Sequence, residues 1–493
     1  MKQDPFFSDF YKSSLALLTD LYEITMAYCY WQQKIADKQA SFYYSFRKKP
    51  FKGQYAVVAG LKNFIEYVER LKFDSDDIQY LSTLNSPTGE PLFEPAFLLY
   101  LSEISFCFDI DAMPEGSVCF PNEPIIRVTG PILQVQLIES ALLNIMNFQT
   151  LIATKASRIC FAAGNDPVVE FGLRRAQGID GAVSASRAAY IGGCCSTSNT
   201  LAGKLFGIPV VGTHAHSWIM AFDTEYQALY AYSQCMPSSC IFLIDTYDSI
   251  SGVKNAIHIA RELRQHGNEM IGVRIDSGSL EKLSKEIRAL LDNEGFPDAK
   301  IMATNDLDEF SIQELKAKGS AINMWGVGTN LVTGKEQPAL DGVYKLSALR
   351  DDQGLWHRKL KISDDVTKVT TPGLLQVRRY TQNKQYVADV VFDELLSSPE
   401  DLVFDFYDEG NEFSIIQEAE YKDLLIPVVR AGRSVYTHPS LKQIREYAKA
   451  ELMSLPKGIK ILEESNQYFL GIEKNLYSIK KELLNNIKKK MEL

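Results

Sequence analysis

Two histidines lie in a short polar segment that follows an apolar run. In GIPVVGTHAHSW, the strand-like residues 208–211 lead into Thr213, His214 and His216. Residues two positions apart point to the same face of an extended chain, so the two imidazoles can share a face. Three interpretations follow: a hydrogen-bonded pair of loop side chains, a zinc site at a strand end, or one nucleophilic or acid–base imidazole.

A zinc site would need further ligands from other strand ends. The chain has six histidines, and His258 and His266 fall within a helix predicted over 251–266. His357 and His438 lie outside the strand–helix units described below. This distribution disfavours the zinc interpretation and leaves the other two open.

A cation and a carboxylate end another apolar run, in EMIGVRIDSGSL. Strand alternation predicts that Arg274 and Asp276 share one face. Ser277 and Gly278 then lead into a helix, and hydroxyl and free N–H groups in such a turn suit an anion or sugar hydroxyls. A salt bridge followed by a helix cap is the structural alternative.

Closely spaced glycines follow a later strand-like run, in NMWGVGTNL. Gly326 and Gly328 would let backbone N–H groups approach phosphate oxygens, and Thr329 adds a hydroxyl donor. The late strand ends of a β/α barrel are a usual place for phosphate. The segment is not a Walker loop, because GxxxxGK[ST] does not occur in the chain.

Basic side chains that could meet an anionic substrate are few and scattered. Arg174 and Arg175 lie in VVEFGLRRAQG, and a further group lies in FRKKPFKG, residues 46–53. The formal net charge is −10, which makes nucleic acid an unsuitable partner. An anionic small molecule can still bind where a few of these cations converge.

Repeated strand–helix units must position these residues. The predicted strands end at Asp245, Asp276 and Asn305, at intervals of about 30 residues, which suits a strand with its return helix. The predicted pairs are 239–245 with 251–266, 269–276 with 279–293, and 300–305 with 310–318, and 321–326 opens a fourth. Such repeats imply parallel strands. Polar residues at strand ends favour a β/α barrel over an open doubly wound sheet.

The regions before and after these strand–helix units have a different pattern of predicted elements. A helix is predicted over Leu15–Tyr30, interrupted at Thr19 and Asp20 by a plausible cap, and residues 115–131 alternate short β runs with turns as in a small sheet. After Lys345, strand-like pieces give way to a helical C-terminal region that ends in a basic run.

Composition narrows the class of protein further. The chain is 46% hydrophobic and 23% charged, as in globular domains. The sequence shows no apolar run approaching the roughly 18 residues of a membrane span, and no secretory signal. Its eight cysteines form no CxxC pair and predict reduced thiols in a cytoplasmic protein.

Together these segments resemble the nicotinate phosphoribosyltransferases. The matching stretches run in the family's order from Leu17 to about Ser440. They are LLTDLYEITMAY, FRKKPFKGQYAVVAGL, EGSVCFPNEPIIRVTGP, EFGLRRAQG, GIPVVGTHAHSW, VRIDSGSL, WGVGTNLVTG, ALDGVYKL and IPVVRAGRSVYTHPS.

The resemblance implies an α/β fold of the type II phosphoribosyltransferases. We expect an irregular β/α barrel over residues 131–345 and a second α/β domain built from N- and C-terminal segments. The N-terminal part would cover 1–130, and 346–493 would complete that domain and add a helical tail. The family assembles as a homodimer whose partner completes each active site.

The resemblance also implies the chemistry. Phosphoribosyl passes from phosphoribosyl pyrophosphate to nicotinate, giving nicotinate mononucleotide and pyrophosphate, the first step of NAD salvage from nicotinate. Mg²⁺ is expected as the cofactor, with no protein ligand assigned, and ATP as a co-substrate hydrolysed through a phosphohistidine.

Site residues are carried over by position in the matching motifs. The expected phosphohistidine is His216, with Asp276 as a second catalytic residue, while His214 occupies a variable position. Tyr22 resembles the tyrosine that reaches across the dimer to stack on nicotinate. The remaining expected contacts are Thr213, Arg274 and Arg174 for nicotinate, and Ser277, Gly278, Gly326, Gly328 and Thr329 for the phosphoribosyl and phosphate groups.

Other functions remain as alternatives. Nicotinamide phosphoribosyltransferase is related and of similar length, whereas quinolinate phosphoribosyltransferases are much shorter. A zinc-dependent barrel hydrolase and a non-catalytic binding protein built on a barrel belong to different classes. Metal analysis and detectable turnover would separate these last two.

Overall fold

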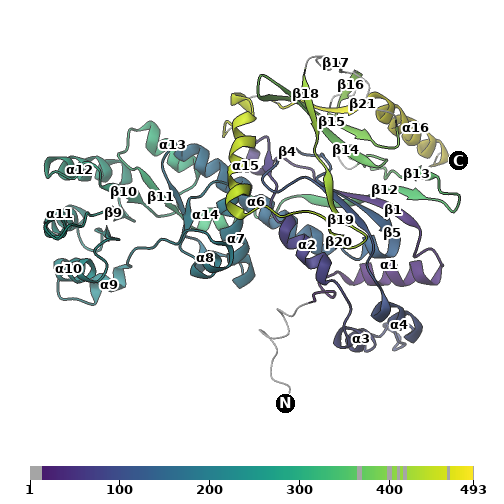
Figure 1. Ribbon diagram of the computed structural model, residues 1–493, viewed down its shortest axis with the longest axis horizontal. Coiled ribbons are helices and arrows are strands. Elements are labelled where there is room, and N and C mark those ends of the chain that lie inside the picture. The colour runs from purple at the N-terminus through teal and green to yellow at the C-terminus, as the bar shows by residue number, and fades with distance from the viewer. Residues whose placement is uncertain are drawn as a thin grey trace. The chain divides into compact units, whose positions relative to one another are not determined.

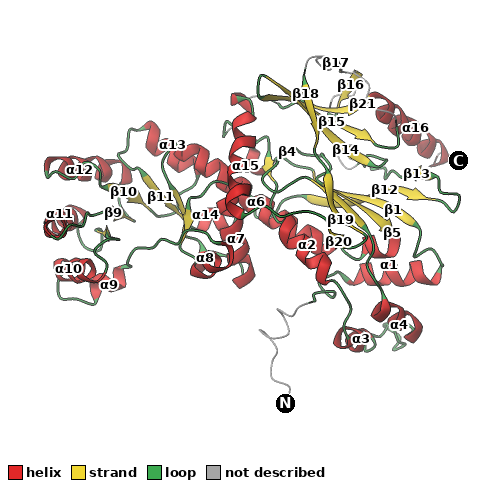
Figure 2. Cartoon of the chain, viewed as in Figure 1, coloured by secondary structure: helices red, strands yellow, loops and turns green. Residues whose placement is uncertain are grey.

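The computed structural model describes residues 14–363, 369–396, 402–407, 411–414, 419–462 and 467–491. The chain divides into two compact units (Figures 1 and 2). Unit 1 comprises Met1–Thr150, Leu340–Ser440 and Ala450–Leu493, and unit 2 comprises Leu151–Ala339 and Leu441–Lys449. The domain limits expected at residues 130 and 345 stay a prediction. Residues 1–13, where no secretory signal was found, lie outside the described part.

Unit 2 is built on a six-stranded sheet whose strand pairs are all parallel. In spatial order the strands are β7 (Ser196–Thr197), β6 (Val168–Glu170), β11 (Met324–Val327), β10 (Lys300–Ala303), β9 (Gly272–Ile275) and β8 (Ile241–Leu243). The sheet curls into a half-barrel, which confirms the expected irregular β/α barrel.

Return helices follow the strands as the repeated units predicted. They are α11 (Ser249–Gln265) after β8, α12 (Leu280–Asn293) after β9 and α13 (Glu309–Ala317) after β10. Carboxylates start two of them: Asp248 accepts the Ser251 N–H at 2.8 Å, and Asp308 forms a capping box with Ser311. Figure 1 shows α11 and α12 next to each other on the left of the strands and α13 above β11.

The other helices of unit 2 fill the connections. They are η2 (Leu173–Arg175), α7 (Ile179–Ile191), α8 (Thr200–Phe206), α9 (His216–Met220), α10 (Glu225–Cys235) and α14 (Thr329–Val332). Two longer helices run across the division between the units, α6 (Glu139–Ala163) and α15 (Leu441–Ser454). Among the described helices, none has both the length and the apolar character that crossing a bilayer requires.

Unit 1 contains mainly antiparallel sheet. Within its described residues, one seven-stranded sheet has the order β13 (Trp356–Arg358), β12 (Gly342–Arg350), β1 (Gln39–Phe46), β5 (Ile126–Pro131), β3 (Asp109–Ala112), β19 (Ile426–Arg430) and β20 (Arg433–Ser434). A six-stranded sheet has the order β17 (Glu412–Ser414), β16 (Leu402–Asp405), β21 (Leu470–Glu473), β15 (Gln385–Asp393), β14 (Leu375–Gln382) and β18 (Glu420–Asp423). A small ribbon pairs β2 (Ala56–Val57) with β4 (Val118–Cys119).

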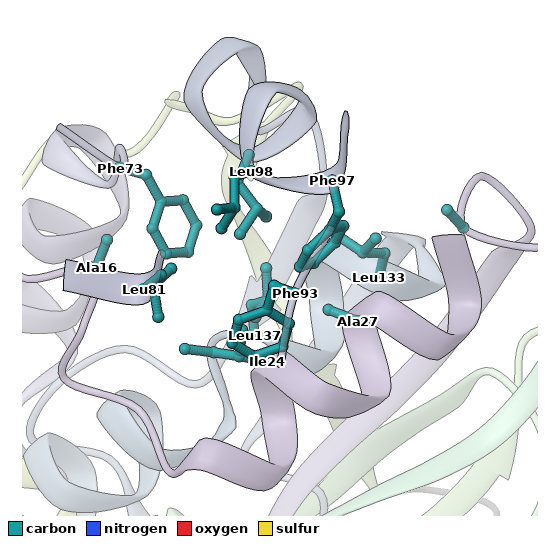
Figure 3. Packing of buried hydrophobic residues seen from close by; sticks show 12 residues of the cluster. Ala16, Ile24, Ala27, Phe73, Leu81, Phe93, Phe97, Leu98, Leu133 and Leu137 are labelled. Atoms are coloured by element: carbon teal, nitrogen blue, oxygen red, sulfur yellow. The ribbon is translucent and has the colours of Figure 1, made fainter. Parts of the chain in front are cut away.

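Four helices of unit 1 pack around a hydrophobic cluster (Figure 3): α1 (Leu21–Gln32), α3 (Ser75–Leu81), α4 (Pro95–Glu103) and α5 (Ile132–Gln136). The other helices of the described part of unit 1 are η1 (Pro50–Lys52), α2 (Leu61–Arg70), η4 (Lys457–Ile459) and α16 (Lys474–Met491). In the cluster, Ile24 of α1, Phe97 of α4 and Leu133 of α5 join residues that are distant in sequence. Burial of these side chains holds α1 against its neighbours.

Two local predictions for unit 1 need correction. The first helix begins at Leu21, not Leu15, with the extended Asp20 as its N-cap residue. Residues 115–131 do not form one small sheet, because β4 pairs with β2 whereas β5 lies between β1 and β3. Sheet membership depends on partners far away in sequence, so alternation alone does not predict it.

Candidate active site

The carboxyl ends of β8, β9 and β10 bring four polar residues together. Parallel strands place these ends at one edge of the sheet, where barrel enzymes carry their active sites. Asp245 Oδ2 accepts hydrogen bonds from the Asp276 N–H and the Ser277 hydroxyl, both at 2.7 Å. The Thr304 hydroxyl, one residue after β10, donates to Asp276. Asp245 therefore fixes the turn that follows β9.

Arg274 of β9 lies at the centre of this group. Its Nε donates to Thr304 Oγ1 at 3.0 Å, its Nη1 to Thr213 Oγ1 at 2.9 Å, and its Nη2 to Asp276 Oδ1 at 3.3 Å. The expected common face of Arg274 and Asp276 is therefore present. A guanidinium has five N–H groups. Two of them have no protein partner within the described residues and can meet a carboxylate.

His216 begins α9 and faces the same group. Its Nδ1 lies 3.1 Å from Thr246 Oγ1, and its Nε2 lies 3.8 Å from Asp276 Oδ2. The side chain is 42% exposed, so a reactant can approach the imidazole. Within the described chain, no group of three or more His, Cys, Asp or Glu side chains is arranged to hold a metal ion.

His214 has a different environment from His216. It is buried, its Nε2 accepts the backbone N–H of Leu243 at 3.2 Å, and its ring packs on Tyr232. Burial, more than any other cause, lowers the pKa of His214 to about 4. The two histidines therefore do not act as a matched pair.

Phe171 is a site residue that the sequence analysis overlooked. It directly follows β6, and the Arg274 guanidinium carbon lies 6.0 Å from its ring centroid. A Cβ atom at Gly326 would lie 2.8 Å from this ring and 2.6 Å from Thr304 Cγ2. Close packing thus requires glycine at 326, and the ring forms an apolar wall beside the cation.

Glu170, the last residue of β6, was also overlooked. Its side chain is buried and accepts hydrogen bonds from the Gly172 N–H, from Ser186 Oγ at 2.8 Å and from Thr197 Oγ1 at 2.6 Å. These donors come from three separate segments. Glu170 therefore fixes the turn that carries Phe171. In the sequence, the signal for Glu170 is a carboxylate within an apolar run directly before FGLRR.

The remaining residues expected to contact phosphate flank this centre. Ser277 and Gly278 form the exposed turn before α12, with Gly278 at φ 76°, a conformation that favours glycine. Gly328 and Thr329 are partly exposed at the start of α14, and a Cβ at Gly328 would lie 3.1 Å from the Phe171 carbonyl oxygen. Their contact with phosphate stays a prediction.

Two expected nicotinate contacts make no hydrogen bond to the Arg274 network within the described residues. Arg174 lies in η2 and is exposed, with no ion pair in the described part of the chain. Tyr22 belongs to α1 of unit 1 and is 47% exposed. Burial, with the carboxylates of Glu139, Glu23 and Asp20 nearby, raises the pKa of the Tyr22 phenol. Both roles remain predictions.

A curled parallel barrel that gathers an arginine, carboxylates and an accessible histidine at its strand ends defines an enzyme of the β/α-barrel class, suited to an anionic small molecule. Three family models match: the nicotinate phosphoribosyltransferase N-terminal domain over residues 17–147, the family's central model over 167–375 and the C-terminal domain over 376–480. The chain belongs to the nicotinate phosphoribosyltransferase family.

Relatives and solved structures agree with this assignment. Nicotinate phosphoribosyltransferase of Bacillus subtilis is 42% identical over 489 residues, covering 98% of each chain. The enzyme of Caenorhabditis elegans is 35% identical, covering 89% of this chain and 87% of its own. The crystal structure of human nicotinic acid phosphoribosyltransferase matches with a TM-score of 0.82 at 28% identity, covering 94% of this chain and 99% of the human one.

Proposed function

We propose that the chain transfers phosphoribosyl from phosphoribosyl pyrophosphate to nicotinate, forming nicotinate mononucleotide and pyrophosphate, with ATP hydrolysis coupled to the transfer. Membership of the family supports the reaction. The observation that carries it in this chain is the Arg274 network, in which a guanidinium with two unpaired N–H groups lies between hydroxyls, a carboxylate and an aromatic ring.

The two unpaired N–H groups of Arg274 suit the nicotinate carboxylate. Charge-assisted hydrogen bonds of this kind are stronger than neutral ones, and a planar fork fits a carboxylate. Thr213 adds a hydroxyl, and Phe171 offers an apolar face for the pyridine ring. This arrangement would direct the ring nitrogen toward the sugar and hold it in a near-attack geometry.

In the transfer, the pyridine nitrogen forms a bond to ribose C1 as the bond from C1 to the pyrophosphate oxygen breaks. Positive charge develops on the sugar, so a nearby carboxylate stabilises the transition state. Asp276 supplies that carboxylate, and Asp245 and Thr304 hold it in place. The turn of Ser277 and Gly278 would receive sugar or phosphate oxygens.

Mg²⁺ would bind with the pyrophosphate of the substrate. Enzymes that act on phosphates commonly hold this ion through one or two carboxylates together with the phosphate oxygens. Oδ1 of Asp245 is buried without a hydrogen-bond partner in the described chain, and Asp276 lies next to it, so these carboxylates fit the ion's shell. When bound, the ion neutralises charge on the leaving pyrophosphate.

His216 is the proposed phosphate acceptor from ATP. If its Nδ1–H donates to Thr246, the Nε2 lone pair stays free to attack the terminal phosphorus, with ADP leaving. Water later hydrolyses the phosphohistidine. The added charge, roughly −2, would reorganise the neighbouring phosphate-binding turns and link ATP use to product formation.

A homodimer in the cytoplasm completes the proposal. Free cysteines, eight in number, agree with a reducing compartment. In the dimer Tyr22 would reach the partner's site. Mixing a Tyr22→Ala chain with a His216→Ala chain should restore activity once subunits exchange, because one site then has both residues intact. No recovery in confirmed heterodimers would place Tyr22 outside a shared site.

One assay tests the reaction. Purified protein receives nicotinate, phosphoribosyl pyrophosphate and Mg²⁺, with and without ATP, and product mass is followed. We expect nicotinate mononucleotide in both cases and faster formation with ATP. Nicotinamide is run in parallel, and equal turnover of the two pyridines would promote the nicotinamide alternative. No turnover of either would refute the proposal.

A histidine variant tests the coupling to ATP. His216→Ala should lose ATP hydrolysis and the phosphohistidine while retaining slow transfer without ATP. The matched control is His258→Ala, since that imidazole lies on the outer helix α11 with a side chain 62% exposed. ATP hydrolysis at the parental rate in His216→Ala would exclude His216 as the acceptor.

A further inference from the structure

The half-barrel of unit 2 has an opening between residues 209–211 and β8. On one side, β7 holds this segment: the Thr197 N–H donates to the Pro209 carbonyl and the Val211 N–H to the Thr197 carbonyl, both at 3.0 Å. On the other side, β8 pairs with β9 alone. Across residues 151–339, all of which are described, no backbone hydrogen bond links residues 209–211 to β8.

One backbone N–H of β8 points into this opening. Ile244 N–H donates to the Arg274 carbonyl of β9 at 3.2 Å. Because successive N–H groups of a strand alternate between its two sides, the N–H of Leu243 faces away from β9. Leu243 is fully buried, and a buried N–H without an acceptor is strongly unfavourable.

The imidazole of His214 spans the opening. Its Nε2 accepts the Leu243 N–H at 3.2 Å, and its ring lies 4.8 Å from the Tyr232 ring, centroid to centroid. To accept a hydrogen bond, Nε2 must be unprotonated. Burial, together with the nearby Arg274 and His216, lowers the pKa of His214 to about 4, so the ring is neutral at physiological pH.

The residues on either side of His214 are the ones that the reaction needs. Thr213 Oγ1 accepts from Arg274 at 2.9 Å, and His216 Nδ1 lies 3.1 Å from Thr246 Oγ1. Residues 212–215 themselves belong to no helix or strand. A shift of this segment would move a substrate contact and the phosphate acceptor together.

We propose that His214 is a positioning residue, a neutral hydrogen-bond acceptor that closes the half-barrel between residues 209–211 and β8 and thereby places Thr213 and His216. The role in catalysis rests on the proposed function, whereas the hydrogen bond to Leu243 is a property of the fold. The first can therefore be tested through kinetics and the second without any substrate.

The kinetic test compares three variants. His214→Gln keeps an oxygen that can accept the Leu243 N–H, whereas His214→Leu fills similar space without an acceptor; His258→Leu is the control on an exposed helix. We expect His214→Leu to lower kcat/KM for nicotinate by roughly ten- to a hundredfold, mainly through KM. His214→Gln should recover most of it. A purely structural defect would lower kcat and the melting temperature with KM unchanged, and that result, or a Gln variant as impaired as Leu, would overturn the proposal.

A spectroscopic test uses the wild-type chain. With six histidines, ¹⁵N-labelled imidazoles can be resolved and His214 assigned by its loss in His214→Gln. We expect a neutral ring with hydrogen on Nδ1 from pH 6 to pH 8 and a slowly exchanging Leu243 amide. A protonated ring, hydrogen on Nε2 or rapid amide exchange would overturn the proposal even if His214→Leu does not fold. Failure of the nicotinate assay would refute the proposed function and leave this result standing.

Discussion

Each unit contains an arginine that is hydrogen-bonded to carboxylates and other oxygens. The two networks differ in how many of the arginine N–H groups have a protein acceptor and in how exposed the side chains are. In unit 1, Arg379 of β14 has a side chain with no exposed surface. Its Nη1 donates to Glu451 at 3.0 Å, its Nη2 to the Val118 carbonyl at 2.9 Å, and its Nε to Asp389 at 2.8 Å. Its Nη2 also donates to Asp389 Oδ2 at 2.5 Å, so four of the five N–H groups have a protein acceptor within the described residues.

In unit 2, Arg274 makes a looser set of contacts. Its side chain is 12% exposed, its aspartate partner Asp276 is 31% exposed, and two of its N–H groups have no partner in the described chain. A fully buried ion pair with four of its five N–H groups hydrogen-bonded serves the fold, because removing one partner leaves an uncompensated charge. A partly open one has capacity left for a ligand. The two networks differ in the number of unpaired N–H groups and in exposure, not in residue type.

The largest effect should follow from breaking the closed network, the one around Arg379. Arg379→Met leaves Asp389 buried without its cation and Glu451 with Lys422 as its remaining cation, and we expect a loss of about 3–5 kcal/mol in the free energy of unfolding. Urea unfolding measures it. The matched control is Arg378→Met on the same strand, whose partner Asp423 is 39% exposed, with an expected loss of about 1 kcal/mol or less. Equal losses in the two variants would show that closure of the network adds no stability.

Substitution in the open network, the one around Arg274, should change substrate specificity more than the free energy of unfolding. Arg274→Gln should reduce the preference for nicotinate over nicotinamide roughly ten- to a hundredfold, the equivalent of one charge-assisted hydrogen bond of about 1.5–3 kcal/mol. Arg274→Lys should also weaken nicotinate use, since a point charge does not replace a planar fork. Specificity constants for both pyridines measure the ratio. An unchanged ratio in Arg274→Gln would move carboxylate recognition elsewhere, with Arg174 as the next candidate.

A pH experiment tests a neighbour of the closed network. Burial, followed by the nearby Asp389, raises the pKa of Glu123 well above its usual value. Above the ordinary Glu pKa of about 4.3 and below the raised one, the folded chain holds one proton more than the unfolded chain. Folding stability from this group is therefore present at low pH and is lost as pH rises, by about 1.4 kcal/mol per unit.

Glu123→Gln removes that dependence because the amide does not titrate. Relative to wild type, the variant should become progressively more stable as pH rises from the ordinary Glu pKa toward the raised one, roughly along the slope of 2.303RT per unit. Urea unfolding at several pH values gives the difference curve. Glu103→Gln, at an exposed position on α4, is the control and should show a flat difference. A flat curve for Glu123→Gln would mean that its carboxyl is ionised in the folded chain.

The smallest effect concerns two serines in one turn. Ser277 donates to Asp245 at 2.7 Å, whereas Ser279 makes no capping bond at the start of α12. Ser277→Ala should raise KM for phosphoribosyl pyrophosphate by less than about tenfold, as the loss of one exposed hydrogen bond implies. Ser279→Ala should leave it unchanged. Equal KM values in all three proteins would remove the Ser277 hydroxyl from the site.

Local patterns in the sequence determined much of unit 2. Apolar runs followed by amphipathic helices predicted β8, β9, β10 and their return helices to within a few residues. Alternation along β9 predicted that Arg274 and Asp276 share a face, and they lie 3.3 Å apart. These features depend on periods of two and 3.6 residues, which neighbouring residues alone establish. The resemblance of the motifs predicted the family.

Other features depended on contacts between distant segments, and only the tertiary structure decided them. Glu170 acts through donors at 172, 186 and 197, and β4 and β5 enter different sheets. His214 and His216, two residues apart with the same side chain, differ because one meets a buried N–H of β8 and the other an open carboxylate. Side-chain type determines which chemistry is available, but burial and the partner across the fold determine which of its states is used.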